Sequence, residues 1–296
     1  MRRVLGTIAA ASALAMTVAP PAMGGGVVAT RVRTTQTSAW GTPSPDPAGL
    51  TYRKSNKRLV VSDPEVDETT LFANKNIFEA TVQGALRTTG KVSPTSLEPE
   101  DVAWDNGAEV LYVADDDKDK IFRINPGPDA RIGTADDSIS TALTTSTFGV
   151  NNPEGLAYRV KSRSLFIADP DTDRIYHVQR GPDGAFGTGD DIRRSFDALA
   201  LGLKNVEDVE WDPKSKHLLI VSSTEEGIIG ETTAAGVLVR TLDISAANLI
   251  QPAGITLAPG SDVATQTHIY VADRGQDNDT NPGENDGRIF EFRVGA

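Results

Sequence analysis

A six-residue motif recurs five times along the chain, and its spacing constrains the fold more than any other feature. The copies read PAGLTY, PEDVAW, PEGLAY, VEDVEW and PAGITL, and they begin at Pro47, Pro99, Pro153, Val206 and Pro252. Their starts lie 52, 54, 53 and 46 residues apart. A period of about 40–50 residues, rich in β-branched residues, is typical of the blades of a β-propeller.

Each motif has the pattern of a strand that is buried on both faces. The fourth and sixth positions are apolar in every copy, and the fifth is small in four of them: Thr51, Ala103, Ala157 and Thr256. This period of two indicates one bulky and one tight face, as expected for the innermost strand of a blade. Glu210 takes the fifth position of the remaining copy and breaks the pattern.

Further strands follow each motif. A second hydrophobic run ends in Asp in four copies, at 59–63, 111–115, 165–169 and 269–273, and the third strands are marked by pairs such as Ile121-Phe122. A fourth strand is visible at 85–89 and 237–242. Four antiparallel strands per repeat predict an all-β propeller of four-stranded blades.

The copy number predicts five blades, with six as the alternative if one blade has diverged. The fifth copy ends after its third strand, at Ala296, whereas the segment from Val27 to Thr37 alternates like a strand. We expect this segment to supply the missing outer strand and to close the ring, which leaves no unpaired edge.

The N-terminus has the features of a secretory signal peptide over residues 1–24. Arg2 and Arg3 precede an apolar stretch from Val4 to Ala19, and Ala22-Met23-Gly24 offers a small-x-small cleavage site. We therefore expect a secreted protein in which residues 25–45 form a loose leading segment and residues 46–296 form the propeller domain. The chain has no cysteine, so the fold has no disulfide framework.

The mature chain is strongly acidic. Without Arg2 and Arg3 it has 27 basic and 41 acidic residues, a formal charge of −14. A field of this sign repels nucleic acid and anionic membranes and favours cations or basic partners, although acidity also simply keeps a secreted protein soluble. We expect a monomer that takes a protein or small-molecule ligand, without nucleic acid or membrane insertion.

These motifs resemble those of NHL-type, SdiA-regulated and gluconolactonase/regucalcin-like propellers, in which Pro-x-Gly opens an inner strand and a hydrophobic run closes on Ala-Asp. The Glu-Asp-Val-x-Trp and Pro-Glu-Gly-Leu-Ala variants also resemble the secreted "esterase-like activity of phytase" group. The resemblance covers roughly residues 45–296 and implies a propeller. Its families contain both binding proteins and enzymes, so it implies no single reaction.

Acidic residues gather where the inner strands begin. In a four-stranded blade, the start of the inner strand and the end of the second strand lie on the same face of the propeller. The second motif position, at this face, is Glu in three consecutive copies. Such carboxylates suit Ca²⁺, which takes six to eight oxygen ligands, often from separate segments. The predicted ligands at this channel mouth are Glu100, Asp101, Glu154, Glu207 and Asp208. The alternative is that these groups cap strand starts or pair with Arg and Lys on adjacent loops.

Two loop types offer other positions for calcium. The loop from Arg274 to Gly287 carries Asp277, Asp279 and Asp286. Gly283 and Arg288 break the EF-hand pattern, so this segment is either a different calcium loop or a solvated loop.

Two near-identical loops, at 127–137 and 181–191, place aspartates beside glycines. We expect structural hairpins there rather than peripheral calcium sites.

Two functions remain open. The first is a non-catalytic calcium-binding propeller; the second is a calcium-dependent hydrolase of phosphoesters or lactones, with Glu207 or Glu210 as general base. Lys204 and Arg274 are the basic residues expected near the rim. Trp104 and Trp211 occupy the inward sixth position, so we expect them to pack in the core rather than stack on a sugar.

Overall fold

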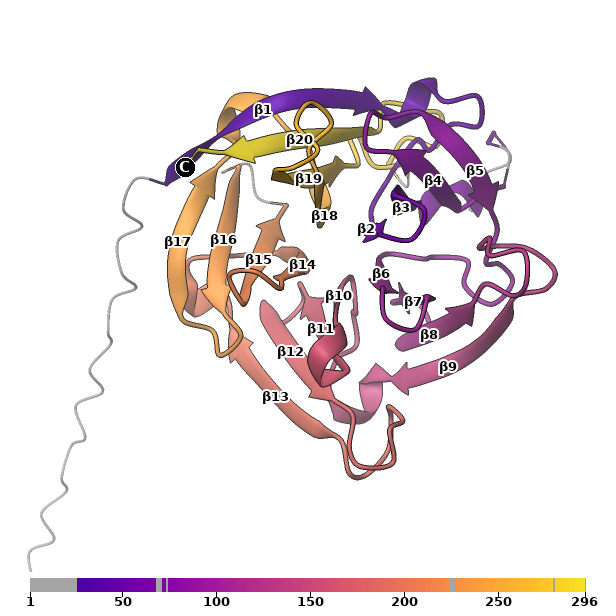
Figure 1. Ribbon diagram of the computed structural model, residues 1–296, viewed down its shortest axis with the longest axis vertical. Coiled ribbons are helices and arrows are strands. Elements are labelled where there is room, and N and C mark those ends of the chain that lie inside the picture. Colours follow the sequence, from indigo (N-terminus) through magenta and orange to yellow (C-terminus); the bar gives the residue numbers. More distant parts are fainter. Residues whose placement is uncertain (1–25, 68–70, 73, 224–226, 279, 296) are drawn as a thin grey trace, which may run out of the picture.

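The computed structural model is all-β, with its sheets arranged around a central axis (Figure 1). It describes residues 26–67, 71–72, 74–223, 227–278 and 280–295. The predicted signal peptide lies outside these residues. The prediction of an all-β fold that contains several four-stranded sheets is confirmed.

Three of the sheets are antiparallel and contain four consecutive strands each. The first comprises β2 (Leu50–Arg53), β3 (Arg58–Ser62), β4 (Ile77–Thr81) and β5 (Leu86–Gly90). The second comprises β6 (Val102–Asp105), β7 (Val110–Asp115), β8 (Lys120–Asn125) and β9 (Ser138–Thr144). The third comprises β10 (Gly155–Arg159), β11 (Ser164–Asp169), β12 (Arg174–Gln179) and β13 (Ile192–Asp197).

The remaining strands form one mixed sheet of eight, in the order β14-β15-β16-β17-β1-β20-β19-β18. One part comprises β14 (Val206–Asp212), β15 (His217–Ser222), β16 (Ile228–Thr233) and β17 (Leu238–Asp243). The other comprises β18 (Pro252–Pro259), β19 (Thr267–Asp273), β20 (Arg288–Val294) and β1 (Val27–Gln36). The N-terminal strand β1 pairs antiparallel with β20 from Ala29 to Gln36 and parallel with β17 through Val27 and Val28 only.

The inner strands β2, β6, β10, β14 and β18 carry the last three positions of the five motif copies, and the core lies between neighbouring sheets. One hydrophobic cluster combines Ala103 and Tyr112 of the second sheet with Leu156 and Ile167 of the third. Another combines residues of β2 and β3 with Ala258 and Tyr270 of β18 and β19, so the last motif packs on the first.

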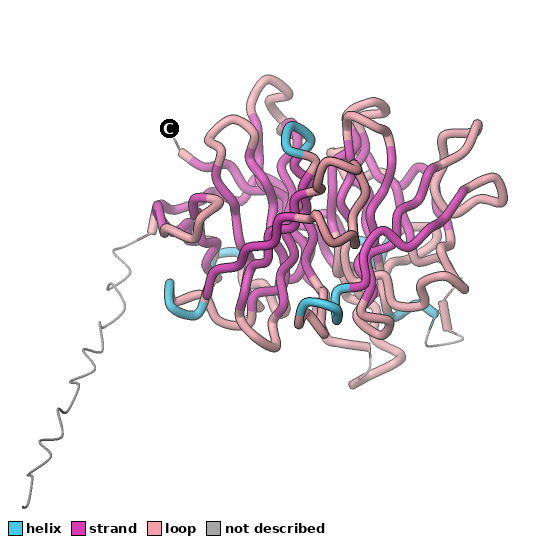
Figure 2. Tube along the Cα trace, turned by 90° about the horizontal axis from the view of Figure 1, so that it is seen from below, coloured by secondary structure: helices cyan, strands magenta, loops and turns pink. Residues whose placement is uncertain are grey.

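The strands run between two opposite faces that carry the loops (Figure 2). Short 3₁₀ helices occur in connections and at strand ends, at Thr37–Ala39, Glu65–Asp67, Thr145–Phe148, Val160–Ser162, Leu199–Leu201 and Ser245–Ala247. Across the described ranges, none of the helices has the length and hydropathy needed to cross a membrane.

Removal of β1 should destabilise the protein because it leaves the backbone groups of β20 unpaired. A chain starting at residue 38 should melt at a clearly lower temperature than one starting at residue 27, and both lack the predicted signal peptide. Thermal unfolding followed by circular dichroism compares the two chains. Equal melting temperatures would contradict a stabilising role for β1.

Candidate functional site

The inner strands start around a small cavity that we call the acidic mouth. The cavity measures about 10 Å³, room for a single water molecule or ion. Five of the eight predicted metal ligands line it, together with Ala48, Ala253 and Arg274: Glu100, Asp101, Glu154, Glu207 and Asp208. The structure thus places these five around one cavity, as the repeat predicted.

The buried Asp101 and Asp208 join inner strands across the channel. Asp101 accepts the backbone N–H of Leu50 through Oδ1 at 3.0 Å and that of Leu156 through Oδ2 at 2.6 Å. Asp208 accepts the N–H of Leu156 through Oδ1 at 3.0 Å and that of Ile255 through Oδ2 at 2.6 Å. Two carboxyl groups therefore link β2, β10 and β18, and their oxygens already have backbone partners.

These two carboxyl groups also contact each other. Burial raises the pKa of Asp101 to about 8 and that of Asp208 well above its ordinary value, and the charge of Asp101 raises the latter further. Ionising both buried groups would place two negative charges in contact, which costs free energy. The pair therefore retains a proton at neutral pH.

The third motif position alternates Gly, Asp, Gly, Asp, Gly, and the packing explains why. A Cβ on Gly49 would lie 2.5 Å from the Asp101 Cα, and one on Gly155 would lie 2.4 Å from the Asp208 Cα. Each aspartate therefore uses space that only a neighbouring glycine leaves free. This alternation is present in the sequence, and it is the feature that could have identified Asp101 and Asp208 as links between strands.

Glu154 and Glu207 form a second carboxyl pair at the acidic mouth. Burial and the neighbouring Glu207 charge raise the pKa of Glu154 to about 11, and the two side chains share a hydrogen bond. The side-chain amide of Asn205 donates to Glu207 Oε1 at 2.6 Å. This pair lacks a cationic side chain of its own among the described residues.

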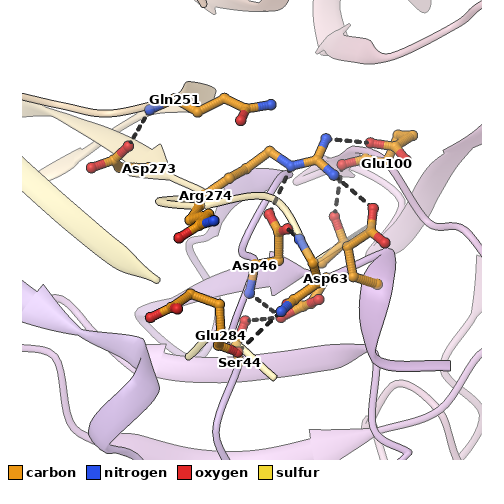
Figure 3. Close-up of polar contacts among 12 residues, drawn as sticks. Ser44, Asp46, Asp63, Glu100, Gln251, Asp273, Arg274 and Glu284 are labelled. Carbon is orange, nitrogen blue, oxygen red and sulfur yellow. Dashed lines mark hydrogen bonds and ion pairs between the residues drawn. The ribbon is translucent and has the colours of Figure 1, made fainter. Parts of the chain in front are cut away.

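Arg274 forms ion pairs on the other side of the acidic mouth (Figure 3). Its guanidinium is 2.7 Å from an oxygen of Asp46, 2.7 Å from one of Glu65 and 3.6 Å from one of Glu100. These carboxylates raise the pKa of Arg274 well above its ordinary value despite its burial. Glu100 therefore pairs with an arginine on an adjacent loop, as the alternative prediction stated.

A further buried carboxyl supports this network. Asp63 accepts the Ser44 hydroxyl at 2.6 Å and the Asp46 backbone N–H at 3.1 Å. Burial, followed by the charge of Asp46, raises the pKa of Asp63 to about 7.

The loop from Arg274 to Gly287, which follows β19, carries three predicted calcium ligands. One of them lies in a cluster of carboxyl groups. Asp277 lies with Asp46 and Glu65, and oxygens of all three are within 4.8 Å of one another. A second group of the same kind consists of Glu98, Glu100 and Asp116. Asp286 instead accepts the Gln276 N–H at 3.1 Å. Asp279 lies outside the described residues.

The two repeated loops have the same internal hydrogen bonds. In the first, Asp136 accepts from the Asp129 backbone and the Thr134 hydroxyl, and Asp137 accepts from two backbone N–H groups. Asp190 and Asp191 repeat these contacts in the second. The aspartates thus bond turn amides, as a structural hairpin requires.

Glu207 and Glu210, the two predicted general bases, line different cavities. Glu210 lines a cavity of about 730 Å³ at the far end of the inner strands, where it meets Tyr52, Trp104 and Trp211. Burial raises its pKa well above the ordinary value, and the nearby Asp208 adds to the shift. The larger cavity therefore opens at the face opposite the one that sequence reasoning selected.

Comparisons with known proteins agree with this architecture. The model of the SdiA-regulated family matches residues 34–273, which confirms the resemblance stated above. No curated protein sequence matches the chain.

Solved structures are similar in fold at low identity. Regucalcin from Agrobacterium tumefaciens, titled a calcium-binding protein, has 13% identity and a TM-score of 0.52, with 89% of this chain and 94% of that one covered. A luciferin-regenerating enzyme has 12% identity and a TM-score of 0.51, with 88% and 94% covered. The β-propeller domain of Myceliophthora thermophila Cps50 (Swd1) has 8% identity and a TM-score of 0.52, with 90% and 100% covered. These likenesses establish the propeller fold.

In calcium-free buffer, the free energy of unfolding should fall as pH rises from about 4 to 8. The native state keeps protons on Asp63, Asp101 and Glu154, whose raised pKa values are given above, whereas the unfolded chain releases them near pH 4. These protons contribute fully to the free energy of unfolding below the pKa that each group has in the unfolded chain. The contribution is lost as pH rises, by up to about 1.4 kcal/mol per pH unit for each proton. Guanidinium unfolding at several pH values measures this slope, and Glu154→Gln should flatten it. A stability that rises over this window would contradict the assignment.

Gly155→Ala should destabilise the protein by about 1–3 kcal/mol, because its Cβ meets the backbone of Asp208 and Glu207. Gly189→Ala is the matched control, since a Cβ there has nothing within 4 Å. It should change the free energy of unfolding by less than about 0.5 kcal/mol. Urea denaturation compares both variants with the parent chain, and equal effects would refute the close-approach argument.

Proposed function

The chain belongs to the SdiA-regulated family, and we propose that it is a secreted, non-catalytic binding propeller whose acidic mouth holds one calcium ion. The observation that carries this proposal is the convergence of Glu100, Glu154 and Glu207 on a cavity of ionic size. Arg274 is the single basic residue among the residues that line it. Carboxylate oxygens from three separate strand starts are the donor set that Ca²⁺ prefers.

The charge balance favours a cation beside Glu154 and Glu207. Arg274 already contacts Asp46, Glu65 and Glu100, so little of its charge is available to the other two glutamates. Two hydrogen-bonded carboxyl groups accommodate either a shared proton or a metal ion. The calcium-binding regucalcin from Agrobacterium tumefaciens is an example of a protein with this fold that binds the same ion.

A binding role is favoured over hydrolysis by the size of the acidic mouth. A cavity of about 10 Å³ has no room for a phosphoester or lactone beside the ion. Moreover, Asp101 and Asp208 bond backbone amides, and Glu210 lies at the other cavity. The calcium-dependent hydrolase is therefore the second candidate, with Glu207 as its base.

The proposal includes a ring of five blades. The pairing of β1 with β20 gives the strands β18 to β20 a fourth member, and the last motif packs on the first. The rim around the acidic mouth would then be presented by a rigid ring to a protein or small-molecule ligand. The proposal that the protein is secreted is supported by the apolar stretch from Val4 to Ala19, which follows two arginines as in a signal peptide.

Calcium should raise the thermal stability of residues 25–296 after treatment with EDTA. A ligand that binds only the native state at 100 times its Kd contributes about 2.7 kcal/mol. Glu154→Gln and Glu207→Gln should each reduce this gain, whereas Asp171→Asn, an exposed carboxylate elsewhere, should leave it intact. Differential scanning calorimetry with and without CaCl₂ measures the shift. The absence of any calcium-dependent shift would overturn the proposal.

Two further measurements separate the alternatives. A gain that survives both glutamate changes but is lost in Asp277→Asn would move the ion to the loop from Arg274 to Gly287. The calcium-loaded protein should not hydrolyse p-nitrophenyl phosphate or δ-gluconolactone faster than calcium alone. Turnover that disappears in Glu207→Gln would instead support the hydrolase.

A further inference from the structure

The cavity at the opposite end of the channel has the volume and walls of a small-molecule site. It measures about 730 Å³, within the range of about 300–1,000 Å³ that is usual for such sites. It is lined by the sixth-position residue of every motif copy: Tyr52, Trp104, Tyr158, Trp211 and Leu257. The repeat thus places four aromatic side chains and one leucine around one space.

The tryptophans of this wall are held firmly. Trp104 is 3% exposed and Trp211 is 9% exposed, and both belong to hydrophobic clusters of the core. The guanidinium of Arg53 lies 4.2 Å from the Trp104 ring centre, and that of Arg159 lies 4.3 Å from the Trp211 ring centre. The expectation of core packing therefore describes part of their environment, and the same rings also form a preorganised surface for a ligand.

The entrance to this cavity is positively charged, in contrast to the chain as a whole. Four of the ten lysines line the cavity, and all four are exposed: Lys54, Lys57, Lys161 and Lys214. None of them forms an ion pair within the described residues. We call this entrance the basic mouth. On a protein of formal charge −12, four unpaired ammonium groups at one cavity attract anions to it.

Deeper in the cavity, Glu210 is a carboxyl group in the position that is small in the other motif copies. It accepts the backbone N–H of Leu257, and the charge of Lys54 reaches it. Asp212, the other acidic residue of the lining, accepts the Lys214 backbone N–H at 2.8 Å within its turn. Glu210 is therefore a buried acidic group of the lining that a bound molecule can meet beside the lysines.

From this arrangement we infer that the basic mouth binds a small organic anion with a flat, largely apolar body. Its anionic group lies among the lysines, its flat body lies against the aromatic ring, and a hydroxyl or N–H group donates to Glu210. Exposed ammonium groups supply attraction over a distance, while the rigid rings supply an apolar wall. This site is separate from the acidic mouth and does not depend on calcium.

The pair of probes that tests this inference is 8-anilinonaphthalene-1-sulfonate and its neutral analogue N-phenyl-1-naphthylamine. The sulfonate should bind the EDTA-treated protein with one-to-one stoichiometry and about tenfold more tightly than the neutral probe. Its affinity should fall as NaCl increases, because exposed charges are screened. Fluorescence titration measures both probes, and quenching of tryptophan fluorescence in a Trp40→Phe background reports proximity to Trp104 and Trp211.

A charge-matched pair of double variants locates the site. Lys161→Gln with Lys214→Gln should weaken sulfonate binding about five- to tenfold and leave the neutral probe nearly unchanged. Arg87→Gln with Lys204→Gln removes the same charge from exposed residues outside the cavity, and it should leave both affinities unchanged. Equal losses in the two double variants, or equal affinities for the two probes, would overturn the inference. Urea midpoints equal to that of the parent chain verify that each variant is folded.

Discussion

The buried contact between Asp101 and Asp208 connects the parts of this molecule that the sequence separates most. A chain without cysteine has no covalent link between its repeats, yet two carboxyl groups accept the backbone N–H groups of β2, β10 and β18. Removing such groups from water costs free energy, and the amide hydrogen bonds together with a retained proton offset that cost. The positions of the glutamates around them follow from this arrangement, because each precedes an aspartate or a glycine of the same motif.

Much of the architecture was predictable because it depends on local periodicity. The period-two pattern of each motif predicted the inner strands, and the alternation of Val27 to Thr37 predicted β1. The second motif position correctly placed Glu100, Glu154 and Glu207 around one cavity. These features need only the rule that equivalent positions in successive repeats meet near the same axis.

Other parts of the site depend on contacts between distant segments, which a single sequence does not reveal. The reach of Arg274 to Asp46, Glu65 and Glu100 requires the fifth motif to lie beside the first. Likewise, a buried aromatic residue has the same sequence pattern whether it faces a neighbouring blade or a cavity. The large cavity was missed for this reason, although Glu210 marked it as a departure from the small fifth position. The two ends of the channel therefore differ in charge, with carboxyl groups where the inner strands start and lysines where they end.

The pairing of β1 with β20 joins the earliest described strand to the latest, about 260 residues along the chain. During synthesis, β1 emerges before the other described strands, and its antiparallel partner β20 is the latest of them. β1 and β20 thus cannot pair until β20 has been synthesised, so this contact is of the long-range kind that slows folding. An unfinished chain carries β1 as an unpaired edge, open to pairing with another chain. Synthesis of β20 therefore removes the edge of β1 that another chain could pair with.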